Sequence, residues 1–304
     1  MYSKQFVLAA LLGYVVAHPV NQQIVDDIKM LTTHWTPMEV SENPFANETE
    51  EQIRARLGTI ITAPFGFQKT SAPRTGVPSS FDARDQWGSC VHPIRDQAQC
   101  GSCWAFGATE ALSDRFCINS NGSVDVVLSP QDLVSCDTVD QGCNGGYLAM
   151  AWRFQQNTGV VTDSCYPYSS QSGRTGSCKH SCSDSESWSP YKCTQGTIVE
   201  STTVDDIKAE IYAHGPVETA FSVYSDFMNY QSGVYHHVSG YLEGGHAVKM
   251  LGWGHEDGMD YWLCANSWGD SWGETGFFKI KQGDCGIDDA TYACTPDLTT
   301  AKFF

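Results

Sequence analysis

The chain has 304 residues, and 41% of them are hydrophobic, so it can form one large domain or two small ones around a sizeable core. Its 35 acidic residues outnumber its 18 Lys and Arg and give a net charge of −17. This balance argues against nucleic acid and anionic membranes as partners, because both attract positively charged surfaces. Thirteen cysteines indicate an oxidising compartment, and the odd count leaves at least one thiol without a partner in the chain.

Residues 1–17 have the pattern of a secretory signal peptide. Lys4 supplies a positive start, and Phe6–Val16 is a mostly apolar run that is too short to span a bilayer. Val15 and Ala17 fit the small-residue cleavage pattern, so we predict cleavage after Ala17. An unusually apolar N-terminal strand is the alternative. No later stretch is long and apolar enough for a membrane span, so we expect a soluble mature chain without a membrane anchor.

Residues 18–77 contain no cysteine, although the rest of the chain is rich in them. Helical patterns occur near Ile24–Thr32 and near Glu48–Leu57. The segment ends in the stretch Thr70–Gly76, whose Pro, Ser and Gly residues predict an exposed linker. These features favour a removable pro-segment. A small N-terminal subdomain that stays attached is the alternative.

From Pro78 onward the chain is rich in cysteine, and its first part has helical patterns. A helix is predicted over Cys103–Asn119, where apolar residues such as Trp104, Ala108 and Leu112 share one face. Further helices are predicted in three places: after the capping residue Ser129, over Tyr147–Gln156, and from the capping residue Thr203 to Ala213.

After Gly215 the pattern changes to strands, which alternate or run apolar and are separated by glycines. The predicted strands are Val217–Val223, Val234–Val238, His246–Trp253, Tyr261–Asn266 and Phe277–Lys281. Helices first and strands later predict an α+β fold with two subdomains and a cleft between them. The helical half would span residues 78–200 and the β half residues 201–304.

Cys100 and Cys103 are separated by two residues at the point where a helical pattern begins. A helix start offers unpaired N–H groups and a positive dipole end, which favour the reactive thiolate. One of these cysteines could therefore be a nucleophile and the other could form a disulfide. Two disulfide-forming cysteines, thioredoxin-like redox chemistry and a zinc site are alternatives. The zinc reading lacks a second pair at the right spacing.

His246 begins an apolar strand, and Asn266 ends the next one. A hydrolytic cysteine needs a base that takes its proton and a third group that orients the base. His246 can be that base, and the amide oxygen of Asn266 can accept a hydrogen bond from its other ring nitrogen. A histidine on a strand is more often a packed core residue. The three residues together favour catalysis, and redox chemistry at Cys103 would leave His246 and Asn266 unexplained.

The run Cys100-Gly-Ser-Cys-Trp104 resembles the nucleophile signature of the papain family of cysteine proteases. In that family a His and an Asn follow well over a hundred residues later, and here His246 and Asn266 lie 143 and 163 residues after Cys103. Within the family the chain most resembles the cathepsin B group, from about residue 78 to residue 289, with a short pro-segment in which Arg56–Thr59 is similar. Other matching runs are Phe81–Trp87, Ile94–Gln97, Gly215–Glu218, Ala220–Phe227, Ser232–Tyr235 and Gly276–Ile280.

The resemblance implies a papain-like fold, with a helical left subdomain, a β-barrel-like right subdomain and the active site in the cleft between them. It implies that Cys103 is the nucleophile, His246 its partner in a thiolate–imidazolium pair, and Asn266 the residue that orients His246. Gln97 would form the oxyanion hole with the backbone N–H of Cys103, where negative charge develops. Trp268 would cover the His246–Asn266 hydrogen bond.

The resemblance also implies substrate-binding residues. Gly145 and Gly146 would pair with the extended backbone of the substrate, although they are also a simple turn after Cys143. The S2 pocket, which holds the P2 residue two positions before the scissile bond, would be largely apolar, with Asp288 and Asp289 pointing elsewhere. We therefore expect Leu, Val or Phe to be preferred over Arg at P2. The implied lining residues are Tyr147, Leu148, Ala220, Ala247 and Ala290.

The chain departs from the cathepsin B group in the interval Cys165–Cys182. That group has a long occluding loop there, with a His-His pair that binds a substrate carboxylate and gives peptidyl-dipeptidase activity. Here the interval is short and holds one histidine, His180, while His236 and His237 lie in the β half. We therefore expect an open cleft and an endopeptidase. A cathepsin B-type peptidyl-dipeptidase and an inactive peptide-binding homologue are the alternatives.

Modifications follow from the resemblance and from short motifs. The cathepsin B pattern implies the disulfides Cys90–Cys117, Cys100–Cys143, Cys136–Cys178 and Cys165–Cys182. It leaves undecided the pairing of Cys193, Cys264, Cys285 and Cys294. Two sequons predict N-glycosylation, at Asn47 and Asn121.

The expected partners are peptide and protein substrates, the chain's own pro-segment as an inhibitor, and cystatin-like inhibitors. We expect no metal, no cofactor, no nucleic acid and a monomeric protein. The acidic mature chain suits a lysosome- or vacuole-like acidic compartment, where carboxylates are less charged and repel one another less. Secretion is the alternative location.

Overall fold

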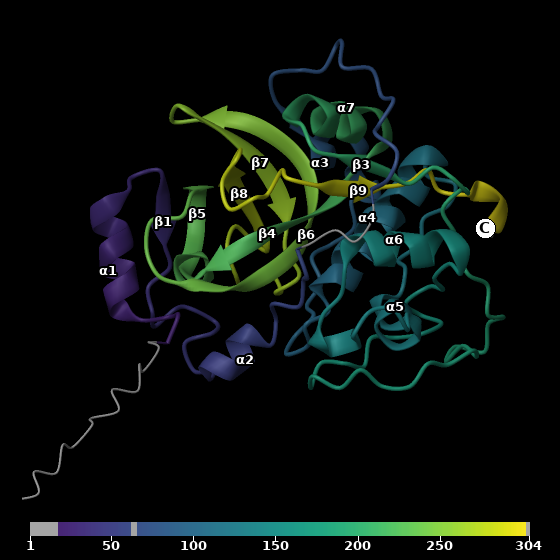
Figure 1. Ribbon diagram of the computed structural model, residues 1–304, viewed down its shortest axis with the longest axis horizontal. Coiled ribbons are helices and arrows are strands. Elements are labelled where there is room, and N and C mark those ends of the chain that lie inside the picture. Colours follow the sequence, from purple (N-terminus) through teal and green to yellow (C-terminus); the bar gives the residue numbers. More distant parts are fainter. Residues whose placement is uncertain (1–17, 62–65, 302–304) are drawn as a thin grey trace, which may run out of the picture.

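The computed structural model describes residues 18–61 and 66–301 (Figure 1). The signal peptide predicted over residues 1–17 therefore lies outside the described residues. Three helices, α4 (Cys103–Asn119), α5 (Pro130–Cys136) and α6 (Leu148–Asn157), gather in one half of the molecule, and most strands form the other half. The predicted α+β fold with two subdomains is confirmed.

Helix α4 is the centre of the helical half and is covered on nearly every side. All its residues from Cys103 to Cys117 are buried, because it packs against α5, α6 and the sheet. Helix α5 begins as predicted, with the side chain of Ser129 accepting from the N–H of Asp132 and Pro130 in the first turn. Helix α4 thus holds its first residue, Cys103, in a fixed place between the two halves.

The strands form one open sheet in the order β1-β5-β8-β7-β6-β4-β9-β3, and the predicted barrel does not close. Its long central strand β6 pairs antiparallel with β4 and β7, while β5 and β8 pair in parallel. The core strands are β4 (Val217–Tyr224), β5 (Tyr230–Tyr235), β6 (Leu242–Glu256), β7 (Met259–Ala265), β8 (Phe277–Lys281) and β9 (Thr291–Ala293). The largest differences from the prediction are that β5 begins and ends earlier, that β6 is longer at both ends, and that β9 was not predicted, while β4 and β7 differ by one or two residues at their ends.

Two segments lie on the half of the molecule opposite to the one expected from a division near residue 200. The short strand β2 (Phe81–Asp82) pairs with β6, and helix α3 (Ala83–Trp87) follows it on the sheet side. In return, Leu298 and Ala301 pack against the core of the helical half. The remaining short elements are β3 (Val199–Ser201), which pairs with β9, and the 3-10 turns Gly88–Cys90, Gly142–Asn144, Ser225–Asn229 and Leu298–Thr300.

Buried ionic contacts join the helical half to the sheet half. Arg115 of α4 is 1% exposed and donates to Glu210 of helix α7 (Val204–His214) at 3.0 Å. It also donates to the carbonyls of Gly215, Pro216 and Cys294. These acceptors pair with the N–H groups of the buried guanidinium. The bonds therefore fix the angle at which α4 meets the strands.

The N-terminal segment (residues 18–77) folds onto the sheet half and then crosses to the other side (Figure 1). Helix α1 (Gln22–Leu31) leads into strand β1 (Trp35–Pro37), which adds to the sheet edge beside β5. Helix α2 (Glu50–Arg54) starts with a capping box between Thr49 and Gln52 and is shorter than predicted. Side chains of the segment belong to the sheet core, among them Ile24, Ile28, Trp35 and Phe45.

Ten of the thirteen cysteines form five disulfides. Four are the pairs that the resemblance implied: Cys90–Cys117, Cys100–Cys143, Cys136–Cys178 and Cys165–Cys182. The fifth, Cys193–Cys294, joins two of the cysteines whose pairing was undecided. Cys103, Cys264 and Cys285 are free thiols.

None of the helices within residues 18–61 and 66–301 is long and apolar enough to cross a membrane. Over the same ranges, no group of three or more His, Cys, Asp or Glu side chains is arranged to hold a metal ion.

Candidate active site

Cys103 is the first residue of α4, and Cys100, three residues earlier, is bonded to Cys143. Its Sγ lies 3.0 Å from Oγ1 of Thr59, which belongs to the N-terminal segment. Burial raises the pKa of the Cys103 thiol, and hydrogen bonds from the Thr59 hydroxyl and from the backbone N–H groups of Ala247, Gly58 and Trp104 oppose this rise. Two of these donors, Thr59 and Gly58, belong to the N-terminal segment, and the N–H groups of Ala247 and Trp104 remain to stabilise a thiolate when that segment leaves.

His246 of β6 and Asn266, which follows β7, form the predicted pair. Nε2 of His246 donates to Oδ1 of Asn266 at 2.7 Å, because an amide oxygen can only accept. Nδ1 of His246 is buried and has no partner, so it is the nitrogen that can take a proton. Burial lowers the pKa of His246 to about 4, although the bond to Asn266 opposes this. The covered site thus favours an uncharged imidazole and an uncharged thiol.

Trp268 covers this pair, as predicted. Its ring centroid lies 4.6 Å from that of His246 at an interplanar angle of 33°. Phe221 lies on the imidazole as well, at 5.9 Å between ring centroids. The two rings exclude water from the His246–Asn266 hydrogen bond and so strengthen it.

Gln97 contacts the backbone of Cys100, three residues before Cys103, and its amide is held at both ends. Its Oε1 accepts from Oγ of Ser267 at 2.7 Å, and its Nε2 donates to the carbonyls of Cys100 and Arg56 at 2.8 and 2.9 Å. Arg56 belongs to the N-terminal segment, so a peptide carbonyl already occupies this donor. Ser267 was missed in the sequence, where its place between Asn266 and Trp268 is the only signal.

The N-terminal segment passes directly over these residues as an extended chain. The N–H of Ile60 donates to the carbonyl of Gly146 at 2.9 Å, and the N–H of Gly146 donates to the carbonyl of Gly58 at 2.8 Å. A side chain is not accommodated here: a Cβ on Gly146 would lie 2.5 Å from Trp104, and a Cβ on Gly145 would lie 2.7 Å from the carbonyl oxygen of Gly58. Gly145 and Gly146 thus lie against the backbone of the chain's own N-terminal segment, and their pairing with a substrate backbone stays a prediction.

Ile60 and Ile61 of the N-terminal segment form part of the wall of a pocket beside this strip. Four of the five residues predicted for S2 line it: Tyr147, Leu148, Ala220 and Ala290. The fifth, Ala247, is fully buried in the core, and its backbone lies against Sγ of Cys103. Ala149, Gly286, Asp289 and Tyr292 also line the pocket and were not predicted to do so.

The expectation that both aspartates point away from the pocket is wrong for Asp289. Its carboxylate lies against Gly286 at the pocket wall, where a Cβ on Gly286 would be 2.9 Å from Oδ2. Asp288 does point elsewhere, because its Oδ2 accepts from Nε1 of Trp262 and from the N–H of Gly283. Adjacent residues face different ways in this turn, which sequence position alone does not reveal.

A family match agrees with this geometry. The sequence profile described as "Papain family cysteine protease" matches residues 77–295. The chain belongs to the papain family of cysteine proteases. Its N-terminal segment precedes the matched region, and Cys103, His246, Asn266 and Gln97 all lie within it.

The proteins similar to this papain-family chain include one named cathepsin B-like and one named procathepsin B. It is 39% identical to cathepsin B-like cysteine proteinase 3 of Caenorhabditis elegans, over 97% of this chain and 88% of that protein. It is 42% identical to a gut-specific cysteine proteinase of the same organism, over 86% of this chain and 83% of that one. The solved structure of procathepsin B S9 from Trypanosoma congolense matches with a TM-score of 0.86 at 31% identity, covering 92% of this chain and 100% of that one.

The loop Cys165–Cys182 of this family member folds back onto the helical half. Oγ1 of Thr175 accepts from the N–H of Cys143 at 3.0 Å, and the carbonyl of Thr175 accepts from the side chains of Gln131 and Ser135. His180 packs its ring against Trp188 at 5.8 Å. His237 is engaged elsewhere, by Asp226.

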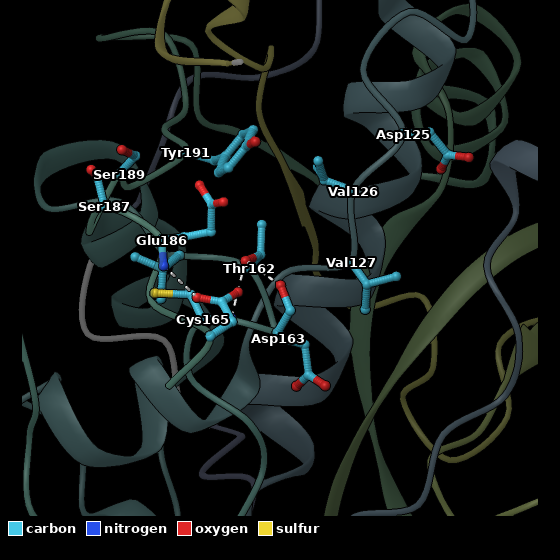
Figure 2. Close-up of a pocket in the computed structure, with 13 residues that line it drawn as sticks. Asp125, Val126, Val127, Thr162, Asp163, Cys165, Glu186, Ser187, Ser189 and Tyr191 are labelled. Carbon is cyan, nitrogen blue, oxygen red and sulfur yellow. Dashed lines mark hydrogen bonds between the residues drawn. The ribbon is translucent and has the colours of Figure 1, made fainter. Parts of the chain in front are cut away.

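An acidic pocket on the helical half is separate from this site (Figure 2). Its carboxylates have partners: Asp163 accepts from Arg95 at 2.7 Å, and Asp125 lies 2.9 Å from Nε2 of His92. Oδ1 of Asp184 accepts from the N–H of Glu186 at 3.0 Å.

Proposed function

We propose that this protein is the zymogen of a secretory-pathway cysteine endopeptidase that hydrolyses peptide bonds through Cys103 and His246. One observation carries the proposal: an extended peptide stretch of the chain itself, Gly58–Ile61, lies over Cys103 with its backbone paired to Gly146 and with Ile60 and Ile61 at the wall of the adjacent pocket. A site that binds an extended peptide against a nucleophile is suited to cleave one.

The proposed chemistry assigns one role to each of these side chains. Nδ1 of His246 takes the proton of the Cys103 thiol, and the thiolate attacks the carbonyl carbon of the substrate. The resulting oxyanion is stabilised by Nε2 of Gln97 and by the backbone N–H of Cys103. The imidazolium, held in place by Asn266, gives its proton to the departing amine and leaves a thioester. Water then enters, His246 removes its proton, and the thioester is hydrolysed.

Residues 18–77 are the inhibitory pro-segment in this proposal. The segment lies over Cys103 with a side-chain oxygen of Thr59 against Sγ, and the carbonyl of Arg56 rather than that of Thr59 accepts from Gln97. The carbonyl that engages the oxyanion donor is thus three residues away from the residue that contacts the nucleophile. This register explains how the segment can fill the site without being cut there.

Endopeptidase activity is supported by the loop Cys165–Cys182, which is bound to the helical half and carries a single histidine, His180. We expect the processed enzyme to cut a denatured protein at internal bonds, because a substrate chain can extend in both directions from an open cleft. Mass spectrometry of a timed digest measures this. A digest dominated by dipeptides released from the C-terminus would instead support the peptidyl-dipeptidase alternative.

The P2 preference is proposed to be apolar, because Tyr147, Leu148 and Ala290 line the pocket. Asp289 at the pocket wall should add a weaker acceptance of Arg. Replacement Asp289→Asn is expected to lower kcat/KM for an Arg-P2 peptide by about threefold to tenfold, as an exposed ion pair allows, and to change a Leu-P2 peptide little.

Fluorogenic peptides that differ only at P2 measure this effect. The matched control is Asp288→Asn, which neutralises the neighbouring carboxylate that points away from the pocket. Equal losses for both peptides in Asp289→Asn would show that Asp289 acts on the fold and not on P2. A wild-type enzyme that prefers Arg to Leu would contradict the apolar preference.

Passage through the secretory pathway is supported by the five disulfides, which form in oxidising compartments. Asn47 and Asn121, the two predicted glycosylation sites, are both exposed. Asn121 lies in a turn with φ of 52°, directly after α4, where an oligosaccharide meets no obstacle from the core. We propose both as acceptor sites, to be tested by the mass lost on treatment with an N-glycosidase.

A further inference from the structure

The edge of the sheet at β3 is covered by the pro-segment after it has left the cleft. Gln68 forms a parallel bridge with Val199, and the N–H of Glu200 donates to the carbonyl of Gln68 at 2.8 Å. The N–H of Phe67 donates in turn to Oε2 of Glu200 at 3.1 Å. When the pro-segment leaves, this edge therefore loses a backbone partner and presents an unpaired N–H group and a carboxylate.

Two cationic residues of the pro-segment, Lys69 and Arg74, bind side chains next to this edge. Nζ of Lys69 donates to Oγ1 of Thr202 at 3.0 Å. Arg74 binds Asp206 in the first turn of α7, with Nε and Nη2 at 2.9 and 2.7 Å from Oδ1. Asp206 is 8% exposed while Arg74 covers it. The surface is thus already shaped for an extended chain that carries positive charge.

Tyr292 connects this edge to the cleft. Its ring lines the proposed S2 pocket, and on its other side it meets the ring of Phe67 edge-on at 6.0 Å between centroids. Its hydroxyl donates to Oε1 of Glu200 at 3.1 Å. A peptide that leaves the S2 pocket away from Cys103 therefore reaches the β3 edge next, and for a substrate this is the stretch upstream of P2.

We propose that in the mature enzyme this β3–α7 edge, formed by Val199–Thr202, Asp206 and Tyr292, binds an extended, cationic stretch of a protein substrate upstream of P2. This inference rests on the proposed endopeptidase function and deepens it. Since Phe67 follows Ile61 by six residues, contact begins about eight residues before the scissile bond in a fully extended chain. Residues 78–304 hold 12 Lys and Arg against 28 Asp and Glu, which suits a cationic partner.

The test compares three quenched fluorescent peptides with the processed enzyme, whose N-terminus is verified to lie after Arg74. All share one P2–P1′ core; one is short, one has a long N-terminal extension with Lys and Arg, and one has an extension of equal length with Gly and Ser. The cationic extension is expected to raise kcat/KM by about threefold to tenfold over the neutral one, mainly through KM. High salt should remove the advantage.

Variants locate the effect. Asp206→Asn keeps a hydrogen-bond acceptor for Thr203 but loses the negative charge. The ratio of kcat/KM for the cationic peptide to kcat/KM for the neutral peptide should therefore fall towards one. The control Asp257→Asn neutralises an exposed loop residue between β6 and β7 and should leave the ratio as in the wild type. Equal rates for both extended peptides in the wild-type enzyme, or an unchanged ratio in Asp206→Asn, would overturn the proposal.

A binding measurement keeps this inference separate from the proposed function. A labelled peptide with the sequence of residues 66–74 should bind the processed wild-type protein and bind Asp206→Asn at least about threefold more weakly. If the short core peptide is not cleaved, the proposed endopeptidase function fails. The binding measurement still shows whether the β3–α7 edge binds a cationic peptide. No binding of the labelled peptide would count against the edge even if the core peptide is cleaved.

Discussion

A Cys103→Ala variant is expected to lose peptide hydrolysis by at least about 10⁴-fold, because in the proposed mechanism the Cys103 thiol forms the covalent bond with the substrate. Its Sγ contacts the peptide stretch that crosses the site, and donors from Trp104 and Ala247 surround it. Alanine removes the sulfur but keeps the backbone N–H of the oxyanion hole. The loss should therefore fall on kcat, while binding of the pro-segment persists.

The matched control is Cys285→Ala, which removes a free thiol in the β half next to Asp284. It is expected to keep the activity of the wild type and the same inhibition by thiol-directed reagents. Release of a fluorophore from a peptide amide, in the presence of a mild reductant, measures both variants. Thiol-dependent hydrolysis that survives in Cys103→Ala would contradict the mechanism, and an inactive wild type would leave the peptide-binding homologue as the better description.

Folding stability is expected to fall as the pH rises from about 4.5 to about 7, because several carboxyl groups are buried without a full set of partners. Burial raises the pKa of Glu110 to about 7 and that of Asp140 to about 7, and each has an oxygen without a hydrogen-bond partner. Burial also raises the pKa of Glu218 well above its ordinary value, and Trp152 is its donor. Each group holds a proton in the folded state over a pH range in which the unfolded chain has lost it.

The sign follows from proton counting. Where the folded state binds more protons than the unfolded state, the free energy of unfolding decreases as the pH rises. For Glu110, facing Lys249, Arg95, Asp114 and His92, the shift from 4.5 to about 7 corresponds to about 3 kcal/mol lost by neutral pH. His246 opposes this trend, because burial lowers its pKa to about 4 and its stabilisation is lost as the pH falls below its ordinary value. The buried carboxyls outnumber it, so the net stability should be greatest in mild acid.

Thermal unfolding at several pH values between 4.5 and 7.5 measures this trend. The variant Glu110→Gln copies the protonated carboxyl, so its melting temperature should depend less on pH than that of the wild type. Asp270→Asn changes an exposed carboxylate and serves as the control. A melting temperature that rises steadily towards neutral pH would show that these carboxyls are ionised in the fold.

Much of the site could be predicted because its residues stand next to strong local signals. Cys103 begins a helix whose apolar spacing is clear, and His246 and Asn266 stand at the ends of apolar runs. Four disulfides agree with those of the family that these residues indicated, and no local signal would have paired them. Cys193 and Cys294 lie 101 residues apart, and their pairing depends on the C-terminus crossing back to the helical half.

The predictions were wrong where tertiary contacts decide which way a side chain points or how far a strand extends. Asp288 and Asp289 are neighbours of the same type, but only Asp288 is drawn away, by Nε1 of Trp262. Ala247 faces Ala220 across two strands, and the register places it in the core behind the nucleophile and not at the pocket. Strand β6 is longer than its apolar part because β4 continues to pair with Gly244 and Gly245, which carry no hydrophobic signal.

The disulfide Cys100–Cys143 and the free thiol of Cys103 place two opposite redox states within one turn of chain. The proposed catalysis needs Cys103 in its reduced form. The loop that carries Gly145 and Gly146 is instead held in place by the oxidised pair Cys100–Cys143. Cys100 is fully buried, so a small reductant reaches it with difficulty. Cys103 is also fully buried while the pro-segment covers it, so a substrate-sized opening gives the same reductant access to its thiol. Removal of the pro-segment thus also determines whether the surrounding redox buffer can reach Cys103.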